Sequence, residues 1–345
     1  MNNKIRQISP AQYAVILLFV FAGAVMAIMD FWARKEAVKG PNAPENAVRV
    51  TNQPITPIPL AIKLDARKVL LGERLYHDSR LSGDNTISCA SCHDLKKGGT
   101  DRAKDSTGIN RNLGPINSPT TYNSGFFFSQ FWDGRAADLV EQAAGPVNNP
   151  KEMGSNWAEV VSKLSKDPSY TRAFAEVYAN GVRGATICDA IAEYEKSLIT
   201  PDSRFDRFLN GDNQALNADE KEGWRLFKEF GCISCHQGVG IGGNMYQTLG
   251  VMENYFDHRV PTKVDQGRFN VTGQAWNRYQ FKVPSLRNIE KTFPYLHDGS
   301  AATLKDVLQV MWKNQLGRSI SDDESSKIVK FLKTLTGTYK GRQLS

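Results

Sequence analysis

The sequence contains no run of lysines or arginines, although its 43 Lys and Arg residues outnumber its 36 Asp and Glu residues and give a net charge of +7. The basic stripe that nucleic-acid binding requires is therefore missing, and this mild excess fits docking of an acidic partner better. Low complexity is also missing over most of the chain, since 41% of residues are hydrophobic and 23% are charged, as in folded proteins. Strand signals are few and short, which favours a mainly α-helical fold.

The longest uncharged stretch runs from Gln7 to Met29 and is almost wholly apolar from Tyr13 onward. Its length is sufficient for a membrane-spanning helix, and Lys4 and Arg6 before it predict a cytoplasmic N-terminus. A signal peptide cleaved near Ala22 is the alternative. Both interpretations predict a periplasmic protein, either anchored to the inner membrane by residues 1–34 or soluble after cleavage.

Five of the 15 prolines fall between Pro41 and Pro59, so residues 35–60 are predicted to form an extended linker. Beyond the linker, apolar residues recur at helical spacing, and a capping box of Ser321 and Glu324 opens the last such segment. The segments with this spacing are "RKVLLGERLYH", "WAEVVSKLS", "ATICDAIAEYEKSLI", "EKEGWRLFKEF", "LKDVLQVMW" and "SDDESSKIVKFLKTLTG".

An internal repeat divides the remainder of the chain. The segment "GERLY", from Gly72, precedes Cys89-Ala-Ser-Cys92-His93, and "GWRLF", from Gly223, precedes Cys232-Ile-Ser-Cys235-His236. Each copy is a helix that leads into the same motif, which predicts two domains of similar size, residues 61–203 and 204–345.

Cys-x-x-Cys-His is the motif of covalent c-type haem attachment. Both thiols bond to haem vinyl groups, and the adjacent histidine coordinates the iron. The sequence therefore predicts two covalent haems, one held by Cys89, Cys92 and His93 and the other by Cys232, Cys235 and His236. A four-cysteine zinc site or two disulfides would not need a histidine after each pair. The fifth cysteine, Cys188, is expected to be a buried free thiol in a helix.

The second axial position of each iron is less easily assigned. The stretch from Ile87 to Thr120 contains no methionine and no histidine besides His93. For the second haem, a methionine ligand would favour a high potential. Met245 and Met252 follow His236 closely and Met311 lies on a distant helical segment, so spacing alone leaves the choice open.

The chain resembles the bacterial dihaem cytochrome c peroxidases of the MauG-related superfamily over roughly residues 60–340. The matching text includes "LSGDNTISCASCHDL", "GPINSPTTYN", "QFWDGRAADLVEQAAGPV", "NPKEM", "AIAEYEKSLITPDSRFDRFLNGD", "GCISCHQGVGIGG", "FKVPSLRNI" and "TFPYLHDGS". The resemblance implies two cytochrome c-like domains packed together, with a low-potential peroxidatic haem in the N-terminal domain and a high-potential His/Met relay haem in the C-terminal domain.

The resemblance also implies roles for individual residues. Met311 falls where the family has its methionine ligand, and Trp132 matches the tryptophan that the family uses between its haems. Gln142 and Glu152 match residues on the distal side of the peroxidatic haem, where a carboxylate can move a proton during O–O cleavage. His297 is also a family position, but the resemblance does not make it an axial ligand.

The resemblance also implies one calcium ion at the domain junction, because Asn117, Thr292 and Pro294 match the family's calcium ligands. The resemblance also suggests a homodimer. His77 and His258 have no motif support, and surface or structural roles are expected for them.

In many members of the family, a histidine in a Ser-x-Gly-His loop closes the peroxidatic haem at rest. The frame of that loop is intact here, from Ser106 through Gly108 to Gly114-Pro115, but Ile109 stands in the place of the histidine. Isoleucine offers no lone pair, so we expect this haem to be open without reductive activation. A refolded loop with another cap, such as His77, is the alternative.

Together these patterns predict an enzyme, a peroxidase that reduces hydrogen peroxide to water. A small cytochrome c, a cupredoxin or a quinol-linked route would supply the electrons. A dihaem electron carrier without catalysis is one alternative, and Glu152 argues against it. A protein-modifying dihaem oxidase is another, and it is disfavoured because that relative carries tyrosine where this chain has Met311.

Overall fold

The computed structural model describes residues 53–344. The predicted membrane helix or signal peptide and most of the predicted linker lie outside this range. Within it, no helix combines the length and the apolar character needed to cross a bilayer. Residues 53–344 belong to one compact unit.

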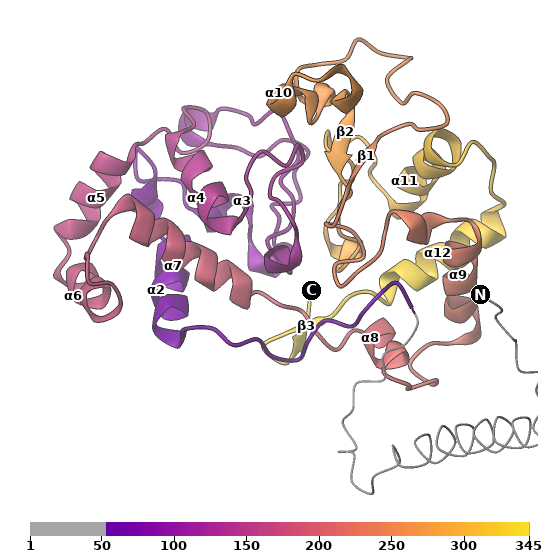
Figure 1. Cartoon of the computed structure of the whole chain (residues 1–345), viewed down its shortest axis with the longest axis horizontal. Coiled ribbons are helices and arrows are strands. Elements are labelled where there is room, and N and C mark those ends of the chain that lie inside the picture. The colour runs from indigo at the N-terminus through magenta and orange to yellow at the C-terminus, as the bar shows by residue number, and fades with distance from the viewer. Residues whose placement is uncertain (1–52, 345) are drawn as a thin grey trace, which may run out of the picture. The chain divides into compact units, whose positions relative to one another are not determined.

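The described part of the chain is mainly helical, as predicted (Figure 1). Every segment with helical spacing forms a helix, and Ser321 and Glu324 make the expected capping box. The α-helices are α2 (Ala66–Tyr76), α3 (Cys89–Cys92), α4 (Leu139–Asn148), α5 (Trp157–Ser165), α6 (Pro168–Val177), α7 (Gly184–Ser197), α8 (Arg204–Leu209), α9 (Ala218–Glu229), α10 (Phe269–Thr272), α11 (Leu304–Val310) and α12 (Asp322–Lys333).

The strands in this range are short and pair into two antiparallel sheets of two strands each. Strand β1 (Tyr246–Thr248) pairs with β2 (Gln280–Lys282), and β3 (Thr338–Tyr339) pairs with β4 (Arg342–Gln343). Neither pair is large enough to form a core, so helices carry the packing.

The repeated segments form the same helix pair twice. In the first copy α2 packs on α7, and in the second α9 packs on α12. A Cβ at Gly72 would collide with the carbonyl of Ala190, and a Cβ at Gly223 would collide with the carbonyl of Lys327. The glycine at the same place in both copies therefore permits close approach of two helix backbones, which explains why the repeat includes it.

Two large hydrophobic clusters are built mainly from residues before and after position 200, respectively. The first is built around Leu75, Phe174 and Ile187, and it includes Cys188, which is a buried free thiol as expected. The second is built around Trp224 and Phe331. In Figure 1, α2 to α7 gather on one side of the compact unit and α9, α11 and α12 on the other.

The described end of the predicted linker, residues 53–60, has no regular secondary structure and is largely exposed, but it buries two isoleucine side chains. Ile55 is fully buried in the second cluster and Ile58 is also buried. The Thr56 carbonyl accepts a hydrogen bond from Arg287, whose guanidinium also pairs with Asp206 at 2.7 Å. Apolar side chains between the prolines thus attach this segment to the C-terminal half.

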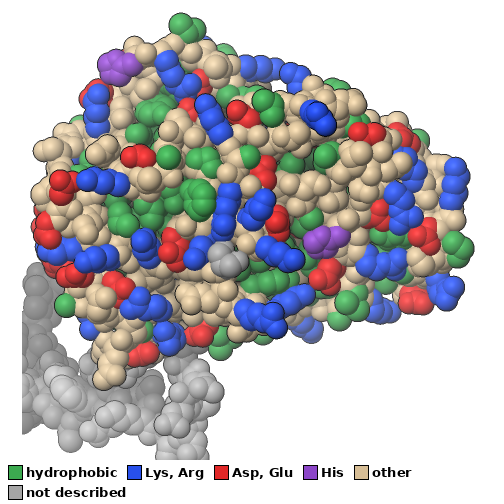
Figure 2. Space-filling model, turned by 180° about the vertical axis from the view of Figure 1, so that it is seen from behind, with side chains coloured by type: hydrophobic (Ala, Val, Ile, Leu, Met, Phe, Trp, Pro, Cys, Tyr) green, Lys and Arg blue, Asp and Glu red, His purple; other side chains and the backbone are tan. Residues whose placement is uncertain are grey.

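The surface seen in Figure 2 carries both signs of charge, with Lys and Arg side chains interspersed among Asp and Glu side chains. Fields from neighbouring opposite charges largely cancel at a distance. On that face, recognition of a partner would therefore depend on local contacts.

Candidate active site

The first Cys-x-x-Cys-His segment is one helical turn fixed at both ends. Ser88 and Ser91 cap helix α3, and the His93 N–H donates to the Cys89 carbonyl at 3.0 Å. The Tyr76 hydroxyl donates to the His93 carbonyl at 2.7 Å, which ties the segment to α2. The His93 Nδ1 atom is buried and has no hydrogen-bond partner among the described residues. Burial lowers the pKa of the imidazole, so the ring is held neutral.

The second segment repeats this arrangement in the C-terminal half. Cys232–Ser234 is a 3₁₀ turn, and the His236 N–H donates to the Cys232 carbonyl at 3.0 Å. The His236 Nδ1 atom lies 3.3 Å from the Ile241 carbonyl, an acceptor that would hold the ring with Nε2 outward. Burial lowers the pKa of this imidazole to about 4. A neutral imidazole is the form that coordinates iron.

The cysteines fit haem attachment better than the alternatives. All five are free thiols. Burial raises the pKa of Cys92 and of Cys232 to about 11, which disfavours the thiolates that zinc needs. Among residues 53–344, the one group of three potential metal-ligating side chains close enough to share an ion is Asp265, His297 and Asp298. The two cysteine pairs therefore do not converge on a zinc site.

Glu152 lies near the first Cys-x-x-Cys-His segment and is partly buried. Its carboxylate accepts a hydrogen bond from the Asn149 side chain at 2.7 Å, and its charge acts on the Cys92 thiol. Burial raises the pKa of Glu152, while Arg135 and Asn149 oppose this shift. A carboxyl group with a raised pKa beside a cofactor can both give and take a proton. Gln142 is half-buried on α4, and no hydrogen bond joins it to Glu152.

The loop that carries Ile109 is attached to the Glu152 segment. The Ile109 N–H donates to the Glu152 carbonyl at 2.8 Å, and the isoleucine side chain lies against Gly83 and Gly154. Ile109 is 7% exposed, and Asn110 beside it has a left-handed backbone with φ of 55°. The loop therefore places a buried apolar side chain where the resemblance implies a histidine. His77 is exposed at the end of α2.

Trp132 contacts segments from both halves of the chain. Its indole N–H donates to the Asn117 carbonyl at 2.9 Å. Its ring meets Phe281 at 6.5 Å and His297 at 6.4 Å between centroids, both edge-on. Trp132 is thus packed at the contact between the two halves.

Met311 follows the last residue of α11 and begins a π-helical turn, Met311–Gln315. Such turns are rare and occur often at functional sites, because the extra residue redirects the side chains. Trp312, in the same turn, is buried against Phe230. Of the two other candidates, Met252 is 64% exposed and Met245 is half-buried beside β1.

The residues matched to calcium ligands come from two segments that lie side by side. The Asn117 N–H donates to the His297 carbonyl at 2.8 Å, and the Asn117 amide donates to the Ala103 carbonyl at 2.9 Å. Thr292 and Pro294 lie just before His297, in the segment that ends a 3₁₀ turn. The oxygen atoms of these three residues are hard donors of the kind that calcium prefers.

The pairing of His297 with Asp265 and the burial of Glu195 were not predicted. His297 is 1% exposed and its Nε2 lies 2.6 Å from Asp265, which is fully buried and also pairs with Arg259. Glu195 is 4% exposed on α7, and one of its oxygens has no partner among the described residues. The burial of Glu195 could have been predicted from the helical spacing, because Glu195 follows Ile187 and Ile191 on the apolar face of the helix.

Comparison with known proteins agrees with this geometry. A family model described as "Di-haem cytochrome c peroxidase" matches residues 66–214. "Cytochrome c551 peroxidase" of Nitrosomonas europaea is 48% identical over 291 residues, covering 84% of this chain and 86% of that protein. "Cytochrome c peroxidase Ccp" of Escherichia coli K12 is 46% identical over 309 residues, covering 89% of this chain but 66% of that protein.

A solved structure also shares the fold. The crystal structure of a MauG-like protein associated with microbial copper homeostasis superposes with a TM-score of 0.73 at 28% identity, covering 86% of this chain and 96% of that one. With two Cys-x-x-Cys-His segments, a duplicated helix pair and relatives that align over most of their length, the chain belongs to the dihaem cytochrome c peroxidase family.

Proposed function

We propose that the protein is a dihaem peroxidase that reduces hydrogen peroxide to water. The observation that carries the proposal is Glu152, a partly buried carboxyl group with a raised pKa that lies beside the first Cys-x-x-Cys-His segment. An electron carrier has no need of such a group. The peroxidase names of relatives at 46% and 48% identity support the same activity.

The haems would be held by the two cysteine pairs and by His93 and His236, and when bound they supply the iron centres that accept peroxide and electrons. The Ile241 carbonyl beside the His236 Nδ1 atom would leave Nε2 of that ring free to coordinate iron, and both imidazoles would bind in the neutral form. Glu152 would move a proton from one peroxide oxygen to the other, so that the leaving oxygen departs as water. Asn149 holds the carboxylate at 2.7 Å, and Gln142 would orient the substrate.

We propose, as the resemblance implies, that the C-terminal haem receives the electrons and has Met311 as its second ligand, because a thioether ligand suits a higher potential than a second histidine would. The contacts of Trp132 with Asn117, Phe281 and His297 support a role in coupling the two haem sites. A small cytochrome c or a cupredoxin is the donor we propose, in the periplasm. The segment before residue 53 would anchor the protein to the inner membrane, and one calcium ion would bind at Asn117, Thr292 and Pro294.

The protein-modifying oxidase is less well supported. A relative named "Methylamine utilization protein MauG", of Methylorubrum extorquens, is 31% identical, against 46% and 48% for relatives named as peroxidases. The residue at position 311 also argues against it, because the resemblance implies a tyrosine at this place in that oxidase and this chain has Met311.

Ile109 provides the test of the proposal. Because its side chain is apolar and buried, we propose that the His93 haem has an open distal face in the oxidised protein. Magnetic resonance of the oxidised holoprotein should show a high-spin ferric signal, and peroxide should be reduced without prior reduction. Two purely low-spin signals would contradict the open site, and no turnover with any reduced donor would contradict the peroxidase.

Ile109→His is the reciprocal variant. Histidine is similar in size, and the backbone hydrogen bond from residue 109 to Glu152 does not depend on the side chain. We expect this variant to become low-spin at rest and to need pre-reduction. Ile109→Leu is the matched control, since it keeps an apolar side chain and should remain active without activation.

A further inference from the structure

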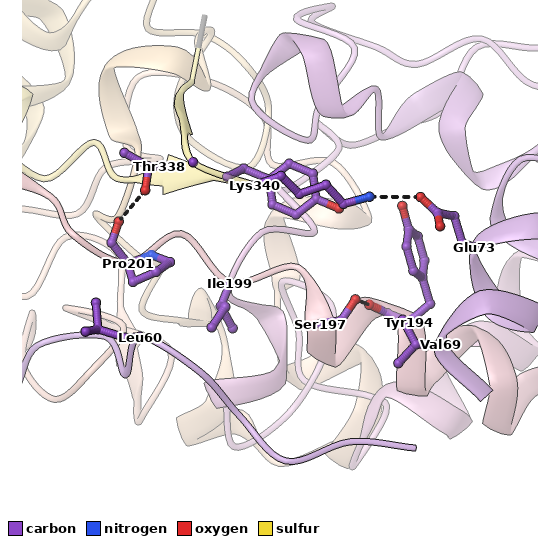
Figure 3. Close-up of a pocket in the computed structure, with 11 residues that line it drawn as sticks. Leu60, Val69, Glu73, Tyr194, Ser197, Ile199, Pro201, Thr338 and Lys340 are labelled. Carbon is purple, nitrogen blue, oxygen red and sulfur yellow. Dashed lines mark hydrogen bonds and ion pairs between the residues drawn. The ribbon is translucent and has the colours of Figure 1, made fainter. Parts of the chain in front are cut away.

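A surface pocket lies between helices of the N-terminal half and the C-terminal hairpin, and neither Glu152 nor Trp132 lines it. It has a volume of roughly 380 Å³ and lies between α2, the C-terminal end of α7 and the hairpin of β3 and β4 (Figure 3). Its walls include Val69, Ile199, Tyr194 and Tyr339, and the ion pair of Lys340 with Glu73, 3.2 Å apart, closes one side. A pocket of this size accepts a single aromatic ring.

A sequence of tyrosine rings leads from this pocket to the first haem-attachment segment. Tyr194 lines the pocket beside Tyr339, and its ring meets the Tyr76 ring edge-on at 5.2 Å. The Tyr76 hydroxyl donates to the His93 carbonyl, and Cys89 packs against the cluster that contains Tyr76 and Tyr194. We name Tyr76, Tyr194 and Tyr339 the tyrosine path.

The hydroxyl of Tyr194 is unusual within this path. It is buried and forms no hydrogen bond of normal geometry among residues 53–344, although buried phenols are normally paired, and the side chain that comes nearest to bonding with it is Tyr339. Figure 3 shows the Tyr194 hydroxyl pointing toward the Glu73–Lys340 pair, and the charge of Glu73 acts on this phenol. A tyrosine that gives up an electron must also release its hydroxyl proton, and Glu73 is the carboxylate nearest to this function in the pocket.

We propose that the pocket binds a small phenol and that the tyrosine path carries electrons from it toward the His93 haem. This is a second electron route, independent of Met311 and Trp132, and it rests on the proposed reduction of peroxide. Val69 and Ile199 would contact the apolar ring, while Glu73 and Lys340 would bind the hydroxyl group. A phenol matches the path because it carries the same oxidisable group as tyrosine.

The reaction balances with hydrogen peroxide as the oxidant. Two phenol molecules each lose one electron and the proton of the hydroxyl group, which gives two phenoxyl radicals. The O–O bond of peroxide breaks as it accepts two electrons and two protons, which gives two water molecules.

The first experiment uses the holoprotein with 2-methoxyphenol and hydrogen peroxide. In Tyr194→Phe and Tyr339→Phe we expect phenol oxidation to fall by about tenfold or more. We also expect peroxide to generate a tyrosyl radical in the wild type, seen by magnetic resonance, and this signal should be missing in Tyr194→Phe. Turnover with a reduced cytochrome c should stay unchanged. Tyr178→Phe is the control, because Tyr178 lies outside the path and bonds to Asp189. Unchanged phenol oxidation in both path variants would overturn the proposal.

The second experiment tests the pocket itself. Val69→Trp fills the pocket while the tyrosines remain, so binding of 2-methoxyphenol measured by calorimetry should be lost and the radical signal retained. Binding that survives this substitution would overturn the assignment of the pocket. A wild type that turns over neither phenol nor cytochrome would instead contradict the peroxidase, and the calorimetric result would still report on the pocket.

Discussion

Glu195 offers a test of how the first haem domain is stabilised. Its carboxyl group is 4% exposed on α7, and one oxygen has no partner among the described residues. Burial raises the pKa of Glu195 to about 8, so the group is mostly neutral in the folded protein at neutral pH. In the unfolded chain the same group ionises near its ordinary pKa of 4.5. Folding therefore takes up a proton here.

The size and the sign of the effect follow from these two values. Below pH 4.5 the Glu195 carboxyl group is protonated in both states and does not lower the free energy of unfolding. Between pH 4.5 and pH 8, Glu195 lowers the free energy of unfolding by about 1.4 kcal/mol for each pH unit. Above pH 8 this destabilisation is constant. At neutral pH the cost is about 3 kcal/mol. Glu195→Gln removes the ionisable group with almost no change in shape, so we expect the variant to be more stable than the wild type by about this amount.

Guanidinium unfolding of the holoprotein, followed by circular dichroism, measures the difference. The gain in the free energy of unfolding should be under about 1 kcal/mol near pH 5 and should grow to about 3 kcal/mol near pH 7. Glu176→Gln, an exposed position on α6, is the control and should show no such trend. A difference that stays constant with pH, or a variant less stable than the wild type at neutral pH, would refute the reasoning.

Three further substitutions test the proposed site. Glu152→Gln should leave the haem spectra intact and reduce peroxide turnover by about 10²–10⁴, because the proton carrier is lost; equal turnover would remove Glu152 from the mechanism. Met311→His should lower the potential of the C-terminal haem and slow its reduction by the donor, and a redox titration with no change would exclude Met311 as a ligand. Asn117→Ala should abolish a calcium content of about one ion per chain, measured by atomic emission after dialysis, whereas Asn148→Ala on the exposed face of α4 should retain it.

Local patterns were sufficient to predict much of the fold. Helical spacing located α2, α5, α7, α9, α11 and α12, and Ser321 with Glu324 located the start of α12. These features depend on residues three or four positions apart, so a single sequence contains the whole signal. The Cys-x-x-Cys-His motif is equally local, which is why the attachment residues could be named before any contact was known.

The contacts that define the site are of another kind. The Ile109 N–H meets the Glu152 carbonyl across 43 positions, and Trp132 meets Asn117 and Phe281 from separate parts of the chain. Such long-range contacts leave no periodic pattern in the sequence, because they depend on how the hydrophobic clusters pack. Burial of Ile55 was missed for the same reason, since the prolines around it indicated an extended segment but not its partner.

The two halves of the chain share the same closely packed helix pair, but they differ in the segments that would surround each haem. Gly72 and Gly223 permit the same close helix pair, and each pair leads into the same attachment turn. Beyond that turn, the first half has an apolar Ile109 beside a carboxyl group with a raised pKa, whereas the second half has a π-turn that begins at Met311. A haem that must bind peroxide needs an open face and a proton carrier, and a haem that only relays electrons needs neither. The two halves therefore share a repeated fold but differ in these two segments, and this difference agrees with the proposed roles of one catalytic haem and one relay haem.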